Sequence, residues 1–184
     1  MQITLMRHGK PVLPAAQWVA PFEMGLWIEQ YDRSEVAATA IAVANMDAAT
    51  AASTIVSSTA PRALSSVAAL GHRPSYADAL FGEAELPFAL WRFPHLPPQI
   101  WTALFRLLWL CGYARGAASV QQTKIRAKLA ARHLIALADT GPVLLVGHGI
   151  MNRMIAKELL ASGWVSRSGH ANRYWSTGVY RIAE

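Results

Sequence analysis

Cysteine is nearly absent from this sequence of 184 residues, in which Cys111 stands alone. A single cysteine excludes a disulfide within the chain and provides no zinc-binding pattern. Long hydrophobic runs are also missing. The most apolar stretch, residues 99–112, is interrupted by Arg106 and is too short to cross a bilayer. We therefore expect neither a structural zinc site nor stable insertion into a membrane.

Internal repeats, low-complexity tracts and an obvious domain boundary are lacking as well. Apolar residues make up 53% of the chain, a share that excludes disorder. The length suits one domain with a substantial core, so we predict a single domain over residues 1–184. Because the first residues already form a predicted strand that carries a candidate site, we expect no signal peptide and a cytoplasmic protein.

Acidic residues are scarce in the second half of the chain. Residues 1–92 carry six basic and eight acidic side chains, whereas residues 93–184 carry eleven basic and three acidic ones, for a net charge of +6. Such asymmetry can indicate a nucleic acid or an anionic membrane as partner. However, no nucleic-acid-binding module is recognisable, and aromatic residues do not alternate with the basic ones. We expect instead an electric field that attracts a small phosphorylated substrate, and no nucleic-acid partner.

Two histidines follow segments that are predicted to be buried strands. Residues 2–6 and 143–146 are short apolar runs, followed by Arg7 and His8 in the first case and by His148 in the second. Ligands of open parallel α/β sheets bind beyond the carboxyl ends of the strands. If the two strands are neighbours, at ~4.8 Å, both histidines face one gap. The helix predicted after the second histidine directs its positive dipole end there, which suits an anion.

Three motifs then stand in order along most of the chain: Arg-His-Gly at residues 7–9, Ser-Ser-Thr-Ala-Pro-Arg at residues 57–62, and Gly-His-Gly at residues 147–149. Together they resemble the histidine phosphatase superfamily, which has the phosphoglycerate-mutase-like fold. The resemblance implies an α/β fold, a three-layer α/β/α sandwich with a mostly parallel central sheet and an antiparallel edge strand. The proline-rich and apolar stretch adds a helical insertion at about residues 87–115.

The resemblance also implies an activity, the hydrolysis of a phosphate monoester without a metal. His8 is the expected nucleophile, because a neutral imidazole nitrogen can attack phosphorus and hold the phosphoryl group as phosphohistidine. Its other ring nitrogen must then donate to a fixed acceptor, for which a nearby backbone carbonyl is the candidate. Arg7 and Arg62 are expected to bind phosphate oxygens. His148 is expected to stabilise the charge that grows during transfer.

The family uses a carboxylic acid to protonate the leaving oxygen. Its pattern, a hydrophobic residue, any residue and then Glu, matches residues 81–83, so Glu83 is the candidate acid. Glu85 competes for this role, because it would point the same way as Glu83 in an extended segment. A solvated loop carboxylate is the alternative for either residue.

Ser57, at the end of the strand predicted over residues 54–57, is a further candidate donor to the phosphate. Ser58 or Thr59 is expected to cap the helix that begins near Pro61. No cofactor and no metal are expected, because no cluster of Asp and Glu suggests a metal site.

The residues around the phosphate motifs depart from the family pattern. Many members follow the first motif with Thr and, soon after, Asn, where residues 10–12 of this chain are Lys-Pro-Val. Mutases and fructose-bisphosphatases carry Trp-Glu-Gly after the acid, where residues 85–87 are Glu-Leu-Pro. A phosphatase is therefore favoured over a phosphoglycerate-type mutase. A catalytically silent phospho-ligand-binding protein is the other alternative, against which the complete set of two histidines and two arginines argues.

The rest of the chain predicts further elements. We expect a loop over residues 11–21, helices over residues 24–31, 36–49, 61–68, 99–111 and 119–138, a strand over residues 74–80, and a strand, a turn at Gly178 and an edge strand over residues 174–182.

In the apolar helix over residues 99–111, one face collects the apolar side chains of Trp101, Leu104, Phe105, Leu108 and Trp109. A core helix packed over the sheet is the favoured interpretation. A lid whose aromatic face lies at the mouth of the pocket is the sharper alternative, and an interface or membrane-surface helix is the third.

Overall fold

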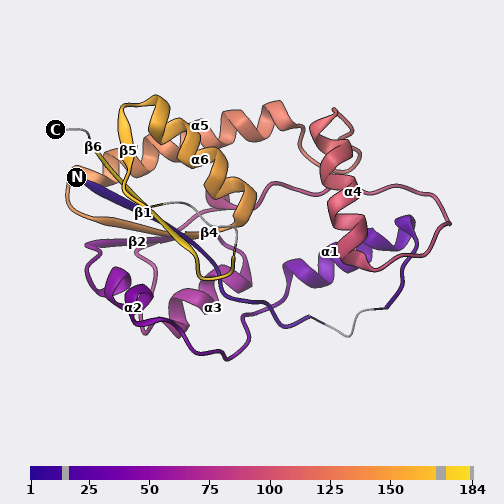
Figure 1. The fold of residues 1–184 in the computed structure, drawn as a ribbon, viewed down its shortest axis with the longest axis horizontal. Coiled ribbons are helices and arrows are strands. Elements are labelled where there is room, and N and C mark those ends of the chain that lie inside the picture. The colour runs from indigo at the N-terminus through magenta and orange to yellow at the C-terminus, as the bar shows by residue number, and fades with distance from the viewer. Residues whose placement is uncertain (14–16, 169–172, 183–184) are drawn as a thin grey trace.

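A computed structural model describes residues 1–13, 17–168 and 173–182, and shows a six-stranded sheet with helices on both faces (Figure 1). The strand order is β3-β2-β4-β1-β6-β5. The strands are β1 (Gln2–Arg7), β2 (Thr54–Ser57), β3 (Tyr76–Ala77), β4 (Val143–Gly147), β5 (Trp164–Ser166) and β6 (Thr177–Ile182). The first four are parallel, β6 is antiparallel to β1, and the edge strand β5 is antiparallel to β6. The predicted α/β fold with a mostly parallel sheet and an antiparallel edge strand is confirmed.

The two outer layers are helical (Figure 1). Helices α5 (Val120–Ala138) and α6 (Gly149–Ala161) cover one face, and α2 (Val43–Thr50) and α3 (Pro61–Ala69) cover the other. Successive side chains of a strand point to opposite faces, so β1 contributes to both cores. Ile3 and Leu5 belong to the apolar cluster that includes residues of α5 and α6, whereas Met6 belongs to the cluster on the side of α2 and α3.

The sheet register places the two histidine motifs side by side. In the parallel pair of β1 and β4, Arg7 lies opposite Gly147. His8 and His148 are the next residues of their strands, and the His8 N–H donates to the Gly147 carbonyl oxygen at 2.9 Å. The strand adjacency on which the two-histidine site depends is therefore present.

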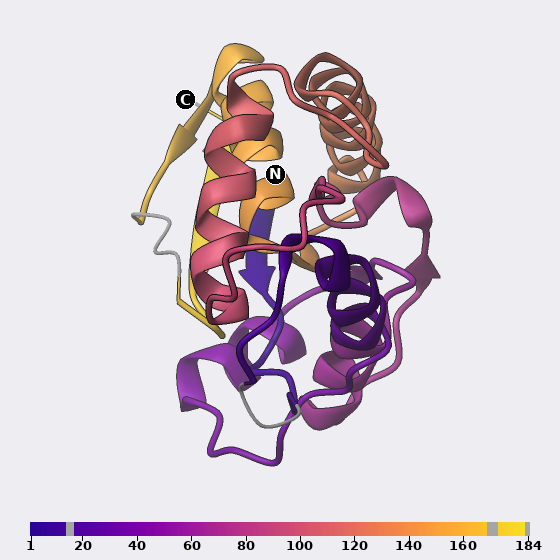
Figure 2. The same ribbon diagram turned by 90° about the vertical axis from the view of Figure 1, so that its right-hand side faces the viewer.

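The predicted helical insertion is confirmed as α4 (Pro98–Leu110), which packs against α1 (Met24–Asp32). Figures 1 and 2 show this pair, the α1/α4 unit, beyond the carboxyl ends of the parallel strands and outside the two helical layers. The unit has a small apolar core of its own, made of Met24, Ala89, Trp101 and Phe105. Two short 3-10 helices, η1 (Pro21–Glu23) and η2 (Ala79–Phe81), complete the described elements.

The structure divides the apolar stripe of α4. Trp101, Phe105 and Trp109 are buried, whereas Leu104 and Leu108 are 40% and 38% exposed. The indole N–H groups of Trp101 and Trp109 donate to backbone carbonyls at 2.8 Å, which satisfies their polar atoms. The core interpretation is correct in that all three aromatic side chains are buried, although Trp101 and Phe105 pack in the core of the α1/α4 unit and not over the sheet. The prediction that this stripe faces the mouth of the pocket is wrong.

Replacement of Phe105 by alanine is expected to lower the free energy of unfolding by about 3–5 kcal/mol, because the side chain is fully buried and leaves a cavity. Leu107→Ala is the matched control on the same helix, since Leu107 is 60% exposed and a surface change costs about 0.5 kcal/mol or less. Urea denaturation of both variants measures the difference. If both variants lose the same small amount of unfolding free energy, the core of the α1/α4 unit does not contribute to global stability.

Several predicted boundaries are wrong, and long-range backbone pairing explains the first of them. The helix predicted from residue 36 begins at Val43. Residues 36 and 37 pair instead with the segment after His8, through an isolated bridge between Pro11 and Val36 and a 2.8 Å bond from the Ala37 N–H to the Lys10 carbonyl. The predicted loop over residues 11–21 is present on both sides of residues 14–16, which lie outside the described residues.

Local turns explain the other differences. The strand predicted over residues 74–80 is shortened to β3 because the Asp78 carboxylate accepts the Leu80 N–H and starts η2. Trp175 has a φ of 63°, which breaks the strand predicted over residues 174–176. Gly178 lies within β6, opposite Leu5, where a turn was expected. The residues predicted as the antiparallel edge strand, 179–182, belong to β6, which lies between β1 and β5, and no strand was predicted over the residues of β5.

Candidate active site

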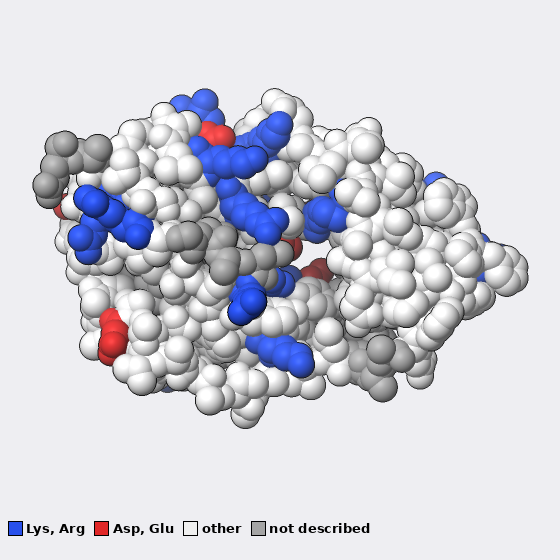
Figure 3. All heavy atoms as spheres, in the orientation of Figure 1, with Lys and Arg blue, Asp and Glu red and all other residues white. Residues whose placement is uncertain are grey.

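A cavity of about 870 Å³ lies between the strand ends and the α1/α4 unit. In Figure 3 a hollow near the middle of the molecule has basic and acidic atoms at its rim, and the surface to its right, over α1 and α4, is almost uncharged. Arg7, Arg62, Glu83 and Glu85 are the sequence-predicted residues that line the cavity. His8, His148 and Ser57 do not belong to its lining. No helix of the described chain is long and apolar enough to cross a membrane.

His8 lies directly behind the cavity wall and is 1% exposed. Its Nδ1 atom is 2.7 Å from the Gly9 carbonyl oxygen, which can only accept, so Nδ1 carries the hydrogen and Nε2 keeps a lone pair. Burial lowers the pKa of His8 to about 3, with further lowering by His148, Arg62 and Arg7. The imidazole is therefore neutral at neutral pH, in the tautomer that a nucleophilic Nε2 requires.

Gly9 holds this geometry because no side chain fits there. A Cβ atom at residue 9 would lie 2.2 Å from Val36 Cγ2 and 2.6 Å from the Trp175 ring. The Gly9 N–H also donates to the Ser66 hydroxyl at 2.9 Å. The close approach fixes the carbonyl to which His8 donates.

His148 is fully buried, with its ring centroid 5.1 Å from that of His8. Its Nε2 atom is 2.7 Å from Ser58 Oγ, which also accepts the Ala60 N–H at 3.3 Å. Ser58 Oγ can accept two hydrogen bonds or donate its own hydrogen, so this contact engages Nε2 and leaves the Nδ1 atom of His148 for another partner. Within the described residues, that Nδ1 atom has no hydrogen-bond partner. Burial, followed by the charges of Arg62, Arg7 and Arg126, lowers the pKa of His148 well below its usual value.

The two arginines reach the site from different elements. Arg62, in the first turn of α3, is buried and donates to the Asp32 carboxylate at 3.0 Å. Its Nε atom is buried without a hydrogen-bond partner in the described part of the chain. The Arg7 guanidinium lies 4.4 Å from the centroid of the Tyr174 ring. That ring also contacts His8, with centroids 5.7 Å apart, and lines the cavity, so it separates His8 from the cavity on that side.

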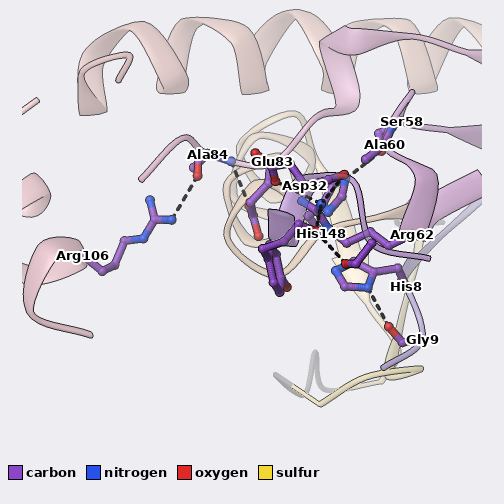
Figure 4. Close-up of polar contacts among 12 residues, drawn as sticks. His8, Gly9, Asp32, Ser58, Ala60, Arg62, Glu83, Ala84, Arg106 and His148 are labelled. Carbon is purple, nitrogen blue, oxygen red and sulfur yellow. Dashed lines mark hydrogen bonds and ion pairs between the residues drawn. The ribbon is translucent and has the colours of Figure 1, made fainter. Parts of the chain in front are cut away.

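Glu83 is anchored at the N-terminus of α6, immediately after His148. Its carboxylate accepts the N–H groups of Ala84 at 2.9 Å, Ile150 at 3.3 Å and Met151 at 3.0 Å. In Figure 4 it lies between the two histidines and Arg106. The structure thus brings Glu83 toward the histidine end of the cavity.

Glu85 has a different environment. Its Oε2 atom accepts the Ala118 N–H at 2.6 Å, which ties Glu85 to the segment between α4 and α5. Two arginines hold the backbone between these carboxylates: Arg126 donates to the Gly82 and Glu83 carbonyls, and Arg106 to the Ala84 and Glu85 carbonyls. The side chains of Glu83 and Glu85, the two candidates for the general acid, therefore point in different directions although they are two residues apart.

The serine predictions need correction. The Ser57 hydroxyl is fully buried and donates to the Ser58 carbonyl at 2.9 Å, so the structure does not bring it to the cavity. Helix α3 has no side-chain cap from Ser58 or Thr59. Ser58 instead contacts His148. The only indication of this role in the sequence is that Ser58 belongs to the second motif, at residues 57–62.

Sequence reasoning missed the aromatic and acidic neighbours of the arginines. Tyr31, Asp32 and Tyr174 come from α1 and from the segment before β6, and none belongs to a recognisable motif. Burial raises the pKa of Tyr31 to about 12, so its hydroxyl stays protonated. In the described ranges, no group of three His, Cys, Asp or Glu side chains is arranged to hold a metal ion.

His8 is expected to make stability depend on pH. Its pKa of about 3 in the folded chain is below the usual value of 6.5, so the unfolded chain alone takes up a proton as the pH falls through 6.5. The free energy of unfolding then falls between pH 6.5 and about pH 3, by up to about 1.4 kcal/mol per pH unit from this site. We expect the free energy of unfolding, measured by urea denaturation at several pH values in this range, to change less steeply with pH for His8→Ala than for the wild type. Parallel slopes would contradict the lowered pKa.

Solved structures of other proteins share this fold. The structure of the Mycobacterium tuberculosis open reading frame Rv3214 matches with a TM-score of 0.61 and 19% identity, over 100% of this chain and 95% of that one. Mycobacterial glucosyl-3-phosphoglycerate phosphatase, in a complex with VO3, matches with a TM-score of 0.61 and 19% identity, over 99% and 96%. The ecdysone phosphate phosphatase of Bombix mori, in complex with tungstate, matches with a TM-score of 0.54 and 12% identity, over 100% and 92%.

No protein-family model matches the sequence, and no curated protein does. At these identities the structural comparisons establish the fold alone.

Proposed function

We propose that the protein is a metal-independent phosphatase that hydrolyses a phosphate monoester through a phosphohistidine intermediate on His8. The observation that carries the proposal is the fixed tautomer of His8, with Nδ1 held by the Gly9 carbonyl and Nε2 unprotonated. The names of structural neighbours such as glucosyl-3-phosphoglycerate phosphatase and ecdysone phosphate phosphatase support phosphatase chemistry in general.

In the first step, His8 Nε2 attacks phosphorus and the bond from phosphorus to the ester oxygen breaks. Glu83, in its acid form, gives its proton to the leaving oxygen. In the second step, water attacks the phosphohistidine, gives a proton to the Glu83 carboxylate, and the phosphorus–nitrogen bond breaks to release phosphate. Nucleophile and acid thus return to their starting states.

The cations and the second histidine stabilise the transferring group. Arg7 and Arg62 bind its oxygens as planar donors, and the buried Arg62 Nε supplies one of these donors. His148 donates from Nδ1 to a phosphoryl oxygen while Ser58 holds its Nε2. The Tyr174 ring contacts both His8 and Arg7, so the phosphate binds next to this ring.

A chromogenic aryl phosphate tests the proposal against the alternatives. We expect the purified protein to release the phenol at a rate that depends on His8. A protein that binds the ester without releasing phosphate would be a silent phospho-ligand binder. A panel of metabolite phosphates, assayed for both phosphate release and isomerisation, identifies a mutase by isomerisation without release.

Activity is expected to survive an excess of a metal chelator. The positive charge that phosphoryl transfer requires is supplied by Arg7 and Arg62, and the His148 imidazole adds a hydrogen-bond donor. The measurement compares phosphate release before and after chelation, with magnesium and manganese added back separately. Loss of activity that either ion restores would contradict the mechanism.

A further inference from the structure

The cavity extends well beyond the space that a phosphate group needs. Its polar end holds Arg7, Arg62 and Glu83, and its far end is formed by the α1/α4 unit. The apolar side chains of that far end are Leu13, Trp27, Ile28, Leu86, Phe88 and Ala103. We call this surface the distal wall.

An aromatic path connects the phosphate end to the distal wall. The Arg62 guanidinium lies 4.7 Å from the centroid of the Tyr31 ring. One helical turn earlier, the Trp27 ring is stacked on Tyr31, with centroids 5.4 Å apart and planes at 19°. Both residues line the cavity, so a flat aromatic surface begins beside the phosphate-binding arginine and continues along α1.

The distal wall is held rigidly from behind. Trp27, Ile28 and Phe88 are half-buried side chains that pack against the core of the α1/α4 unit. Helix α4 presents its second face to the cavity, at residues 99, 102, 103 and 106, while Trp101 and Phe105 face the core. The only charged side chain on that face is Arg106, whose guanidinium is turned to the backbone carbonyls of residues 84 and 85.

Resting on the proposed function, we propose that the substrate is a phosphate monoester of an alcohol with an extended apolar or aromatic body, which lies along Tyr31 and Trp27 against the distal wall. A small polyol phosphate would leave the apolar side chains of this wall in contact with water. An apolar body removes both surfaces from water, which favours binding in proportion to the area covered.

The test is a series of straight-chain primary alkyl phosphates of increasing length, with glycerol phosphate as the polar reference. Primary alkoxides are equally poor leaving groups, so the chemical step is constant along the series and kcat/KM reports binding of the body. We expect kcat/KM to rise by up to about fourfold per methylene, the factor for about 0.8 kcal/mol, until the wall is covered. Phosphate release by His8→Ala gives the background.

Two glutamine substitutions on α4 show where the body binds. Ala103→Gln places an amide in the distal wall, and Leu107→Gln places the same group one helical turn further along, at an exposed position that does not line the cavity. We expect Ala103→Gln to lower the ratio of long-chain to short-chain kcat/KM by about tenfold, and Leu107→Gln to leave the ratio at the wild-type value. Neither change removes a core side chain, and thermal denaturation of both variants verifies folding.

The contrary outcomes are distinct. If every ester is hydrolysed in a His8-dependent way but kcat/KM does not change with chain length, the distal wall does not bind substrate while the proposed function stands. A preference for small bisphosphates that Arg106→Gln abolishes would also overturn the inference, because the cavity would then select a second anion. If no ester of either kind is hydrolysed, the proposed function fails and the inference fails with it.

Discussion

Replacement of His8 by alanine is expected to reduce turnover by at least about 10⁴-fold while the fold is retained. The second histidine of the described site has its Nε2 engaged by the Ser58 hydroxyl, whereas in His8 it is Nδ1 that is held, by the Gly9 carbonyl, and Nε2 keeps its lone pair. The adjacent backbone contacts, such as the His8 N–H bond to the Gly147 carbonyl, do not depend on the imidazole. Phosphate release from an aryl phosphate, with circular dichroism to verify folding, measures the effect.

A trapping experiment makes this expectation specific to covalent catalysis. Wild-type protein mixed with labelled substrate and quenched in base should retain a phosphoryl group that acid removes, as a phosphorus–nitrogen bond requires. His8→Ala should retain none, and His95→Ala, which changes an exposed histidine, should label like the wild type. Wild-type turnover by His8→Ala would refute the nucleophile assignment.

The parts of the site that depend on neighbouring residues in the sequence could be predicted from the sequence. A histidine that follows a buried strand must lie at the end of that strand, and the register of β1 with β4 brings two such ends together. A backbone carbonyl was the expected hydrogen-bond acceptor for His8, and the structure identifies it as that of Gly9. These features need no knowledge of distant packing.

The remaining features depend on contacts between distant segments. Residues 36–42 are rich in helix-forming alanine, but residues 36 and 37 pair with the segment after His8, and this tertiary pairing overrides local propensity. The apolar residues of α4 follow one stripe in the sequence, yet only Trp101 and Phe105 of this stripe belong to the core that α4 shares with α1. Asp32 meets Arg62 from a helix thirty residues earlier, and no spacing rule links the two.

Glu83→Gln is expected to have the second largest effect, and its size should depend on the leaving group. For an alkyl phosphate, whose alkoxide must be protonated as it leaves, we expect kcat/KM to fall by about 10²–10⁴-fold. For an aryl phosphate with a nitro group, the phenolate leaves without a proton, so the loss should be less than about tenfold. The same substitution thus separates a lost proton donor from a disturbed site, which would slow both esters equally.

Glu85→Gln supplies the matched control, because it makes the same chemical change two residues away. Its carboxylate contacts the Ala118 N–H, whereas Glu83 lies on the N-terminus of α6 beside His148. We therefore expect Glu85→Gln to slow alkyl and aryl esters by the same small factor. Glu83→Gln also loses part of its acceptor capacity for the Ala84, Ile150 and Met151 N–H groups, so urea denaturation accompanies the kinetics. If the dependence on the leaving group appears in Glu85→Gln instead, the proton donor is Glu85, and the anchoring of Glu83 at α6 is structural.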